Sequence, residues 1–463
     1  MDLTKIFKYI PEVAKPEEKK LGFNTKLKWT LIILAAFFIL ANVPLFGLSN
    51  NALERFKYLA IILGTDFGSI ISLGIGPIVM ASIILQLLTF SGIFGIDVTT
   101  SEGKKFFQGI QKLFVLFFII FEASVYVLMK GLEALPNFAP LLIFQLILGG
   151  IAIFYMDEVC QKWGFGSGVS LFIAAGVSWR LITSAFQFIN EQGKNCLIDF
   201  GNIACAGKVL VLIQAISNKY PTELLSALSA ILATIIIFLI VAWAQSLKVE
   251  IPLSFGRIRG YGIKWPLSFF YSSVIPVILT AALMATLQLF GGLLQNWLGY
   301  ATILGGFIEG RAVSGFAFWI GNENLLDMLI RGGFSYKYLL QGVTHVLFFT
   351  TCSTLFAILW VKTAGMDSKT QAHKIAASGL QVAGFRQDER VLESILDRYI
   401  MPLTVMGGIA IGLLASVTDL LGALVSGTAI LLVIMIMFQF YQNIGQQHQM
   451  DMVPAMKKFM GKE

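Results

Sequence analysis

Apolar residues occur along this chain in long blocks, and short polar segments separate the blocks. A block of about 17 to 25 apolar residues can cross a hydrocarbon core of roughly 30 Å as a helix. We therefore expect ten membrane helices, the second of them shorter than the rest. They lie near residues 28–45, 77–90, 107–129, 140–159, 169–189, 226–243, 267–290, 338–361, 399–416 and 423–440. Little of the chain is left for a soluble domain.

The stretch from residue 53 to residue 77 interrupts this pattern. Glu54, Arg55 and Lys57 break the apolar run 53–63, and glycine-containing segments follow it. The remaining helix of about 14 apolar residues, at roughly 1.5 Å per residue, is too short to cross a bilayer. Non-helical backbone at membrane depth needs the shelter of protein or of a water-filled cavity. We expect a re-entrant element beside a pore, and the alternative is a surface loop before a short helix.

Two short patterns recur in the second and in the last helices of the two halves of the chain. One is an apolar residue two positions after a proline, and the other is an aliphatic residue five positions after the glycine of a Ser-Gly pair. The first pattern pairs Pro77 and Val79 in the first half with Pro276 and Ile278 in the second. The second pattern pairs Gly168 and Ile173 with Gly427 and Leu432. Five helices followed by five would place the second half inverted in the membrane, as in many transport proteins. Matches this short also arise by chance.

Composition supports a membrane protein. The 463 residues are 56% hydrophobic and 13% charged, whereas soluble domains carry roughly a quarter charged residues. The pI of about 9.1 is no sign of nucleic-acid binding, because the basic residues follow membrane topology. Most of the 34 Lys and Arg residues fall on the side of the two termini. We therefore expect an all-α integral membrane protein with both termini in the cytosol.

These expectations divide the chain into segments. The Lys-rich start and the long first span, with no small-residue cleavage site after it, predict no removable signal peptide. We expect a cytosolic N-terminal segment, an N-terminal half, an external loop, a C-terminal half with two cytosolic loops, and a cytosolic tail. In that order the ranges are 1–27, 28–189, 190–225, 226–440 with loops 244–266 and 362–398, and 441–463.

Few residues offer chemistry. The four cysteines match no zinc pattern, the three histidines form no cluster with a nucleophile, and no nucleotide-binding glycine-rich loop is present. We expect no metal, no cofactor and no enzymatic activity. Cys196 and Cys205 are the only pair on the expected external side, so a disulfide between them is a hypothesis, with two free thiols as the alternative. Glu122 lies inside a span, where a charge usually faces the protein interior, and Arg180 is expected to snorkel or lie at a helix interface.

Several longer motifs resemble one family. They read LGIGPIVMASIILQLL over 73–88, KWGFGSGVSLFIAAGV over 162–177, EIPLSFGRIRG over 250–260, GFR over 384–386 and RYIMPLTVM over 398–406. In this order they resemble the archaeal type of SecY protein translocase channels, a family related to the alpha subunit of the eukaryotic translocon of the endoplasmic reticulum. The resemblance covers residues 5 to about 446. It implies ten transmembrane helices in two inverted, pseudo-symmetric five-helix halves, with a re-entrant plug helix and a lateral gate toward lipid.

The resemblance also implies site residues. The implied pore ring is wholly aliphatic and comprises Ile75, Val79, Val169, Ile173, Ile278 and Leu432. The implied plug covers 55–67, with Arg55, Phe56, Leu59, Ile62, Gly64 and Phe67, and Gly64 and Gly68 would be its hinges. Without the resemblance, each ring residue would be taken for an ordinary core or lipid-facing residue, and the plug for a short interfacial helix. The implied lateral gate contains Gln86, Glu122 and Thr286, although Met80 and Thr286 replace a threonine and an asparagine that archaeal relatives can have.

Two basic cytosolic loops are implied to dock the ribosome. Their residues are Arg257, Arg259, Lys264, Arg386 and Arg390, together with Lys369 and Lys374. Arg and Lys there would meet RNA phosphates in a salt-sensitive contact, although positive-inside charge alone explains part of this pattern. Other implied partners are a single-span SecE-type subunit, a small third subunit of the beta type, the signal recognition pathway, the nascent secretory polypeptide and membrane lipid. The implied location is the cell membrane.

The resemblance implies a passive channel that lets secretory chains cross the membrane and lets membrane helices exit sideways. Two other classes stay open. A secondary transporter of a small solute with five-plus-five inverted repeats would need an ion or solute site at the midplane. A structural membrane scaffold would need no pore, so polar residues in place of Ile75 and Val79 would leave its ion leak unchanged.

Overall fold

The structure is a computed structural model of the 463-residue chain. It describes residues 11–17, 21–53, 60, 63–91, 100–189, 194–196, 198, 205–255, 262–272, 274–308, 310–333, 335–377, 380–382 and 389–459.

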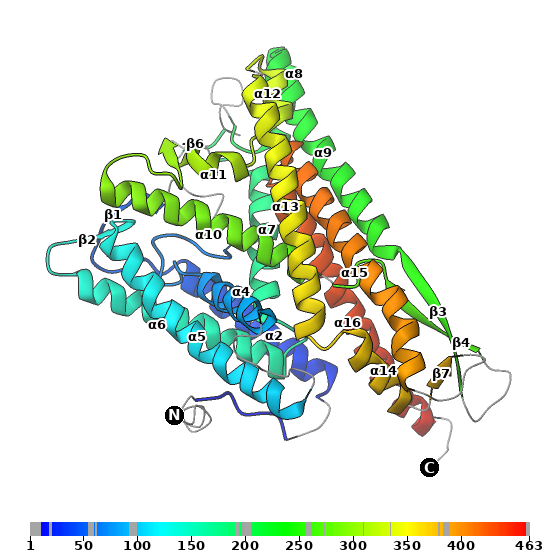
Figure 1. Cartoon of the computed structure of the whole chain (residues 1–463). Coiled ribbons are helices and arrows are strands. Elements are labelled where there is room, and N and C mark those ends of the chain that lie inside the picture. Colours follow the sequence, from blue (N-terminus) through cyan, green and yellow to red (C-terminus); the bar gives the residue numbers. More distant parts are fainter. Residues whose placement is uncertain are drawn as a thin grey trace.

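Long apolar helices make up most of the described chain (Figure 1). The N-terminal half contains α2 (Phe23–Ala41), α4 (Gly76–Phe90), α5 (Ser101–Leu128), α6 (Ala139–Trp163) and α7 (Gly168–Phe186). The C-terminal half contains α9 (Pro221–Ser246), α10 (Ile275–Leu298), α13 (Tyr336–Thr363), α15 (Glu389–Leu420) and α16 (Gly427–Phe459). Within the described residues, nine of these helices are long and apolar enough to span a membrane, and α4 is shorter. The multi-spanning helical fold is confirmed, and the exact count of ten membrane helices stays a prediction.

Shorter elements connect the spans, and several of them are strands that the sequence did not indicate. The helices are α8 (Lys208–Asn218), α11 (Gly315–Ile320), α12 (Leu325–Ile330) and α14 (Ser368–Ala377). The strands are β1 (Leu48–Asn51), β2 (Leu132–Ala134), β3 (Lys248–Phe255), β4 (Gly262–Ser268), β5 (Gly306–Ile308), β6 (Arg311–Ser314) and β7 (Leu380–Val382). β1 pairs with β2 and β5 with β6, and β3 lies between β4 and β7; all of these pairs are antiparallel.

The three-stranded sheet joins two loops that are far apart in sequence. β3 and β4 form a hairpin in the first expected cytosolic loop, and β7 from the second loop pairs with β3, with Leu253 opposite Val382. Buried Ile251 and Leu267 contribute to a second, smaller core with residues of α14 and α15. The expected span 267–290 therefore begins later, at Ile275, because its first apolar residues are buried against protein instead of lipid.

The two halves share one continuous core. α4 packs against α10 and α13, while α16 packs against α2, α7 and α10. In Figure 1, α2, α4, α5 and α6 lie on one side, α9, α13, α15 and α16 on the other, and α7 between them. The main cluster of buried apolar residues draws members from both halves. The two bundles therefore pack against each other through a shared apolar core.

The first described residues, 11–17, are bound to the ends of α5 and α6. The Glu12 carboxylate forms an ion pair with Lys112, at 2.5 Å, and Lys112 also contacts Glu158 at 2.9 Å. The Lys162 ammonium donates to the Val13 carbonyl at 2.6 Å. The hydrogen bond from Lys112 holds the pKa of Glu12 below its usual value. The N-terminal segment thereby ties α5 to α6 at one end of the bundle.

Candidate functional site

The six ring residues lie at the beginnings of four helices. Ile75 directly precedes α4, and Val79 is in its first turn; Val169 and Ile173 open α7. Ile278 is in the first turn of α10, and Leu432 lies five residues after the start of α16. Proline near the start of α4 and of α10 favours a helix beginning there, because its fixed φ is helical and its missing N–H would have no partner at this position.

These residues meet in one apolar cluster. Ile75, Val79, Ile173, Ile278 and Leu432 are all buried members of the main core, none more than 6% exposed. Val169, the sixth, is partly buried and packs against the same core. Four helices from both halves thus contribute these branched alkyl groups to the shared core. Their role as a seal stays a prediction.

The described part of the expected plug is folded against this cluster. The Leu63 carbonyl accepts a hydrogen bond from the Ile75 amide at 2.9 Å. Gly64 has φ of +55° and lies against α7, where an added Cβ would stand 3.8 Å from the Ile173 nitrogen. Gly74, also with φ of +55°, allows close approach, because an added Cβ would be 2.3 Å from the Leu63 carbonyl oxygen. Leu63, near the end of the expected plug, is thus bonded directly to a ring residue.

Not all of the expected plug can be placed. Arg55, Phe56, Leu59 and Ile62 lie outside the described residues. Phe67 is described and is partly buried, and its carbonyl accepts a hydrogen bond from the Asn51 side chain at 2.8 Å. Gly68, the second expected hinge, has φ of +100°, a conformation that favours glycine.

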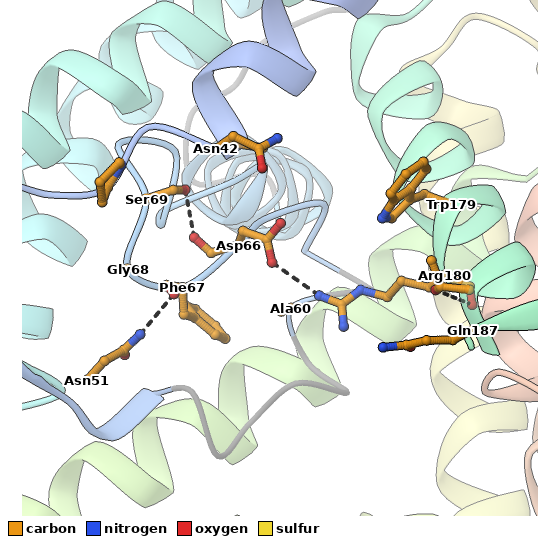
Figure 2. A pocket seen from close by; sticks show the side chains of 13 residues that line it. Asn42, Asn51, Ala60, Asp66, Phe67, Gly68, Ser69, Trp179, Arg180 and Gln187 are labelled. Carbon is orange, nitrogen blue, oxygen red and sulfur yellow. Dashed lines mark hydrogen bonds and ion pairs between the residues drawn. The ribbon is translucent and has the colours of Figure 1, made fainter. Parts of the chain in front are cut away.

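A cavity of about 700 Å³ opens next to the plug (Figure 2). Arg180 reaches across it from α7, and its guanidinium lies 3.4 Å from the Asp66 carboxylate. The Asp66 backbone carbonyl accepts a hydrogen bond from the Ser69 hydroxyl at 2.7 Å. Arg180 therefore has a specific partner on the plug. Sequence reasoning missed Asp66, because nothing along the chain relates it to a residue 114 positions away.

The three residues expected at the lateral gate are buried, but the described residues include no hydrogen bond that joins them. Glu122 is 2% exposed and lies beside Gly76, where an added Cβ would be 3.0 Å from its Oε2 atom. Gln86 is ten residues further along α4, about 15 Å away by helix rise. The Oε1 atoms of Glu122 and of Gln86 are buried without a hydrogen-bond partner. Thr286 is buried in α10, which packs against α4.

Most of the basic loop residues cannot be placed. Arg257, Arg259 and Arg386 lie outside the described residues, as does the side chain of Lys264, whose backbone is in β4. Arg390 is exposed in the first turn of α15. What the structure adds is the pairing of β3 with β7, which brings the two loops side by side.

Cys196 and Cys205 form a disulfide, with their Cα atoms 5.3 Å apart. Cys160 is buried and Cys352 is half-buried, and both are free thiols. Within the described part of the chain, no group of three or more His, Cys, Asp or Glu side chains could hold a metal ion.

Two buried aspartates next to the ring helices also escaped sequence reasoning. Asp157 of α6 accepts a hydrogen bond from the Val169 amide at 3.0 Å, and Asp419 of α15 accepts one from the Thr428 amide at 2.7 Å. A signal for them was present, since each lies near the end of an apolar helix and shortly before a Ser-Gly pair.

Comparison with known proteins identifies the family. A model of the SecY family matches residues 69–441. The protein translocase subunit SecY of Methanothermobacter thermautotrophicus is 41% identical over 461 residues, covering 98% of each chain. A solved translocation channel, in which the plug domain of SecY is described as stabilising the closed state and maintaining a membrane seal, is 34% identical with a TM-score of 0.81. It covers 98% of this chain and 99% of that one.

A structure from a eukaryote is similar as well. Sec61 in the canine ribosome-channel complex from the endoplasmic reticulum is 33% identical, with a TM-score of 0.79. The match covers 98% of this chain and 99% of that one. The family model spans more than half of the chain, and the archaeal relative matches it almost from end to end. The chain therefore belongs to the SecY family.

Proposed function

We propose that the cluster of six aliphatic side chains is the seal of a protein-conducting channel. The observation that carries this proposal is that all six lie at or near the starts of four helices from both halves and pack in the apolar core that those halves share. Branched alkyl groups exclude water and ions from a narrow constriction, yet they form no directional bonds with a polypeptide that passes between them. Such a seal can part around chains of any sequence and close again behind them.

The plug would be a second barrier, directly attached to the first. The Leu63 carbonyl binds the Ile75 amide, and Asp66 forms an ion pair with Arg180 of α7. Both contacts are single polar interactions of modest strength. They favour the closed position without making the plug hard to displace. The free energy for displacement must come from the translocating chain or its driving partner.

Lateral release of membrane helices would use the contact between the two halves. α4 of the N-terminal half packs against α10 and α13 of the C-terminal half. Gln86, Glu122 and Thr286 are buried on α4, α5 and α10. Buried polar atoms without partners make an apolar interface less stable, so this seam can separate more readily than a fully apolar one. An apolar segment in the pore would then partition into lipid.

The cytosolic side would carry the two basic loops, with both termini beside them in a cell membrane. Pairing of β3 with β7 holds the loops together, which would present Arg257, Arg259, Lys264, Arg386 and Arg390 as one surface toward ribosomal RNA. The similar canine protein occurs in a ribosome-channel complex. A SecE-type subunit, a beta-type subunit and the signal recognition pathway complete the proposed partners. The proposed segments are the N-terminal segment 1–27, the halves 28–189 and 226–440, the external loop 190–225 and the tail 441–463.

Reconstitution tests this function. Vesicles that contain the complex should import a secretory precursor when ribosomes or another driving partner are supplied. With cysteines at Val79 and Ile278, a stalled precursor should crosslink to both positions. Val79→Asn should raise ion leak through the resting channel, because a polar side chain allows water into the constriction. No crosslinks and an unchanged leak together would refute the proposed pore.

A further inference from the structure

Two of the ring helices begin in the same way, one in each half. α7 starts with Gly168 after Ser167, and α16 starts with Gly427 after Ser426. In both, a buried aspartate of the preceding helix binds the backbone amide of the second helical residue. Asp157 Oδ1 accepts from the Val169 amide at 3.0 Å, and Asp419 Oδ1 accepts from the Thr428 amide at 2.7 Å. The two aspartates are 6% and 5% exposed.

Glycine at the first helical position makes this approach possible. A Cβ added at Gly168 would be 2.7 Å from the Cα atom of Asp157. A Cβ added at Gly427 would be 2.1 Å from the carbonyl carbon of Thr418, the residue before Asp419. Both distances are below any normal contact. Each ring helix therefore starts in direct backbone contact with the preceding helix, and the aspartate is held at its end.

Further contacts hold the other oxygen of each carboxylate. Asp157 Oδ2 accepts a hydrogen bond from the Gln161 side chain at 2.8 Å. Asp419 Oδ2 accepts one from the Thr428 hydroxyl and lies 3.6 Å from the Nε2 atom of His345. The Nδ1 atom of His345 lies 2.8 Å from the Ile320 carbonyl oxygen, so α13 also constrains the site. Asp157 is thus anchored on its own helix, whereas Asp419 is held by two groups of Thr428 and lies beside His345 of α13.

The spacing relates both contacts to the ring. Val169, whose amide binds Asp157, is itself a ring residue, and Ile173 follows four positions later. Leu432 follows four positions after Thr428, whose amide binds Asp419. Residues four apart share one face of a helix, so in each half the bound amide and the ring side chain lie one turn apart on the same face.

We propose that Asp157 and Asp419 are positioning residues for the pore ring. By holding the first turns of α7 and α16, they fix the height and the rotation at which Ile173 and Leu432 enter the seal. This inference rests on the proposed function, because it requires the six aliphatic residues to be the seal. It adds a contact that is present in both halves, in which a buried aspartate holds the start of α7 in one half and of α16 in the other.

Carboxylates at helix N-termini often stabilise a protein without any other role, so the experiment must separate positioning from stability. Asp157→Ala and Asp419→Ala, each in the full complex in vesicles, are compared with Asp157→Asn and Asp419→Asn, which keep an acceptor oxygen. Glu158→Ala is the matched control, because Glu158 is the next residue on α6 but binds Lys112 and Lys162 instead of a ring helix. Ion leak and thermal unfolding are measured for all five.

We expect ion leak to rise about five-fold in the alanine variants, the factor that corresponds to loss of a helix cap. The asparagine variants should stay near the unmodified protein. Glu158→Ala should lower thermal stability without raising the leak. If the alanine variants leak no more than Glu158→Ala while Val79→Asn leaks, the positioning role is wrong and the seal stands. If Val79→Asn does not leak, the proposed seal itself fails.

If an alanine variant does not assemble, Asp157→Glu and Asp419→Glu test the same inference. These keep the charge and the acceptor but move both by one methylene. The ion leak should rise if the position of the acceptor oxygen determines the position of Ile173 and Leu432. A leak equal to that of the unmodified protein would overturn the inference.

Discussion

The ion pair between Asp66 and Arg180 offers the sharpest test of how the plug is held. Replacing Arg180 by Gln removes the charge but keeps a long polar side chain on α7. The two charged groups are 3.4 Å apart, and their side chains are 64% and 27% exposed. Because water reaches both, the value for surface pairs applies, about 0.2 to 1 kcal/mol. That range corresponds to a plug-displaced population between about 1.4-fold and five-fold higher.

The assay is ion flux through the resting complex in planar bilayers or vesicles, recorded at several salt concentrations. The Arg180→Gln variant should leak more than the unmodified protein at low salt. The difference should shrink toward 1 M salt, where the Debye length falls to roughly 3 Å. Asp66→Asn should show the same increase, and the double variant should not exceed either single variant, since all three lack the same pair.

Exchange of the charges supplies the control. Asp66→Arg combined with Arg180→Asp restores an opposite pair across the cavity and should return the leak toward its original value. The reasoning is refuted if Arg180→Gln and Asp66→Asn add independently, or if their leak does not depend on salt. Either result would mean that the two side chains act on the channel separately.

Three further predictions follow from packing, covalent structure and charge. Gly149→Ala should destabilise the protein by about 1 to 3 kcal/mol, because the new Cβ would be 1.9 Å from the Ile70 carbonyl oxygen. Gly176→Ala is the control and should not destabilise the protein, because no atom lies within 4 Å of the new Cβ. Thermal unfolding of both variants measures the difference. Serine in place of both cysteines of the disulfide should lower stability by about 2 to 4 kcal/mol and make the external loop sensitive to protease. Docking of the N-terminal segment should be constant above the usual pKa of Glu12 and weaken as pH falls through its lowered pKa. Pepsin cleavage before α2 reports this. Glu12→Gln should reduce the pH dependence without abolishing it, because a second carboxylate, Glu158, also binds the segment through the Val13 amide.

Hydropathy predicted the spans because the signal is local. A run of apolar residues becomes a helix in lipid, since every backbone polar group must be satisfied within the segment. The same signal misplaced the beginning of α10, because hydropathy does not distinguish burial in lipid from burial against protein, and Leu267 is a β4 residue that packs with α14 and α15. It also began α15 ten residues late, at 399 instead of Glu389, since the first turns of that helix carry charged residues.

What the sequence could not predict depends on contacts between distant segments. The pairing of β3 with β7 joins residues more than a hundred positions apart. The partner of Arg180 is a plug residue, and the partners of Asp157 and Asp419 are backbone amides, which no side-chain pattern encodes. The ring residues were named by resemblance, because an isolated valine or isoleucine in a span is indistinguishable from any other core residue. The sequence does show an aspartate before each of the two Ser-Gly pairs, although the spacing differs between the halves.

The hydrogen bond between the Leu63 carbonyl and the Ile75 amide would couple the two proposed barriers, the plug and the seal. A segment that widens the proposed constriction by moving Ile75 would also loosen the plug. When the segment has passed and Ile75 has returned to its place, its amide can again bind the Leu63 carbonyl of the plug. We infer that brief thermal widening of an empty channel ends in reclosure, whereas an occupant that keeps Ile75 displaced also keeps the plug away for as long as it stays.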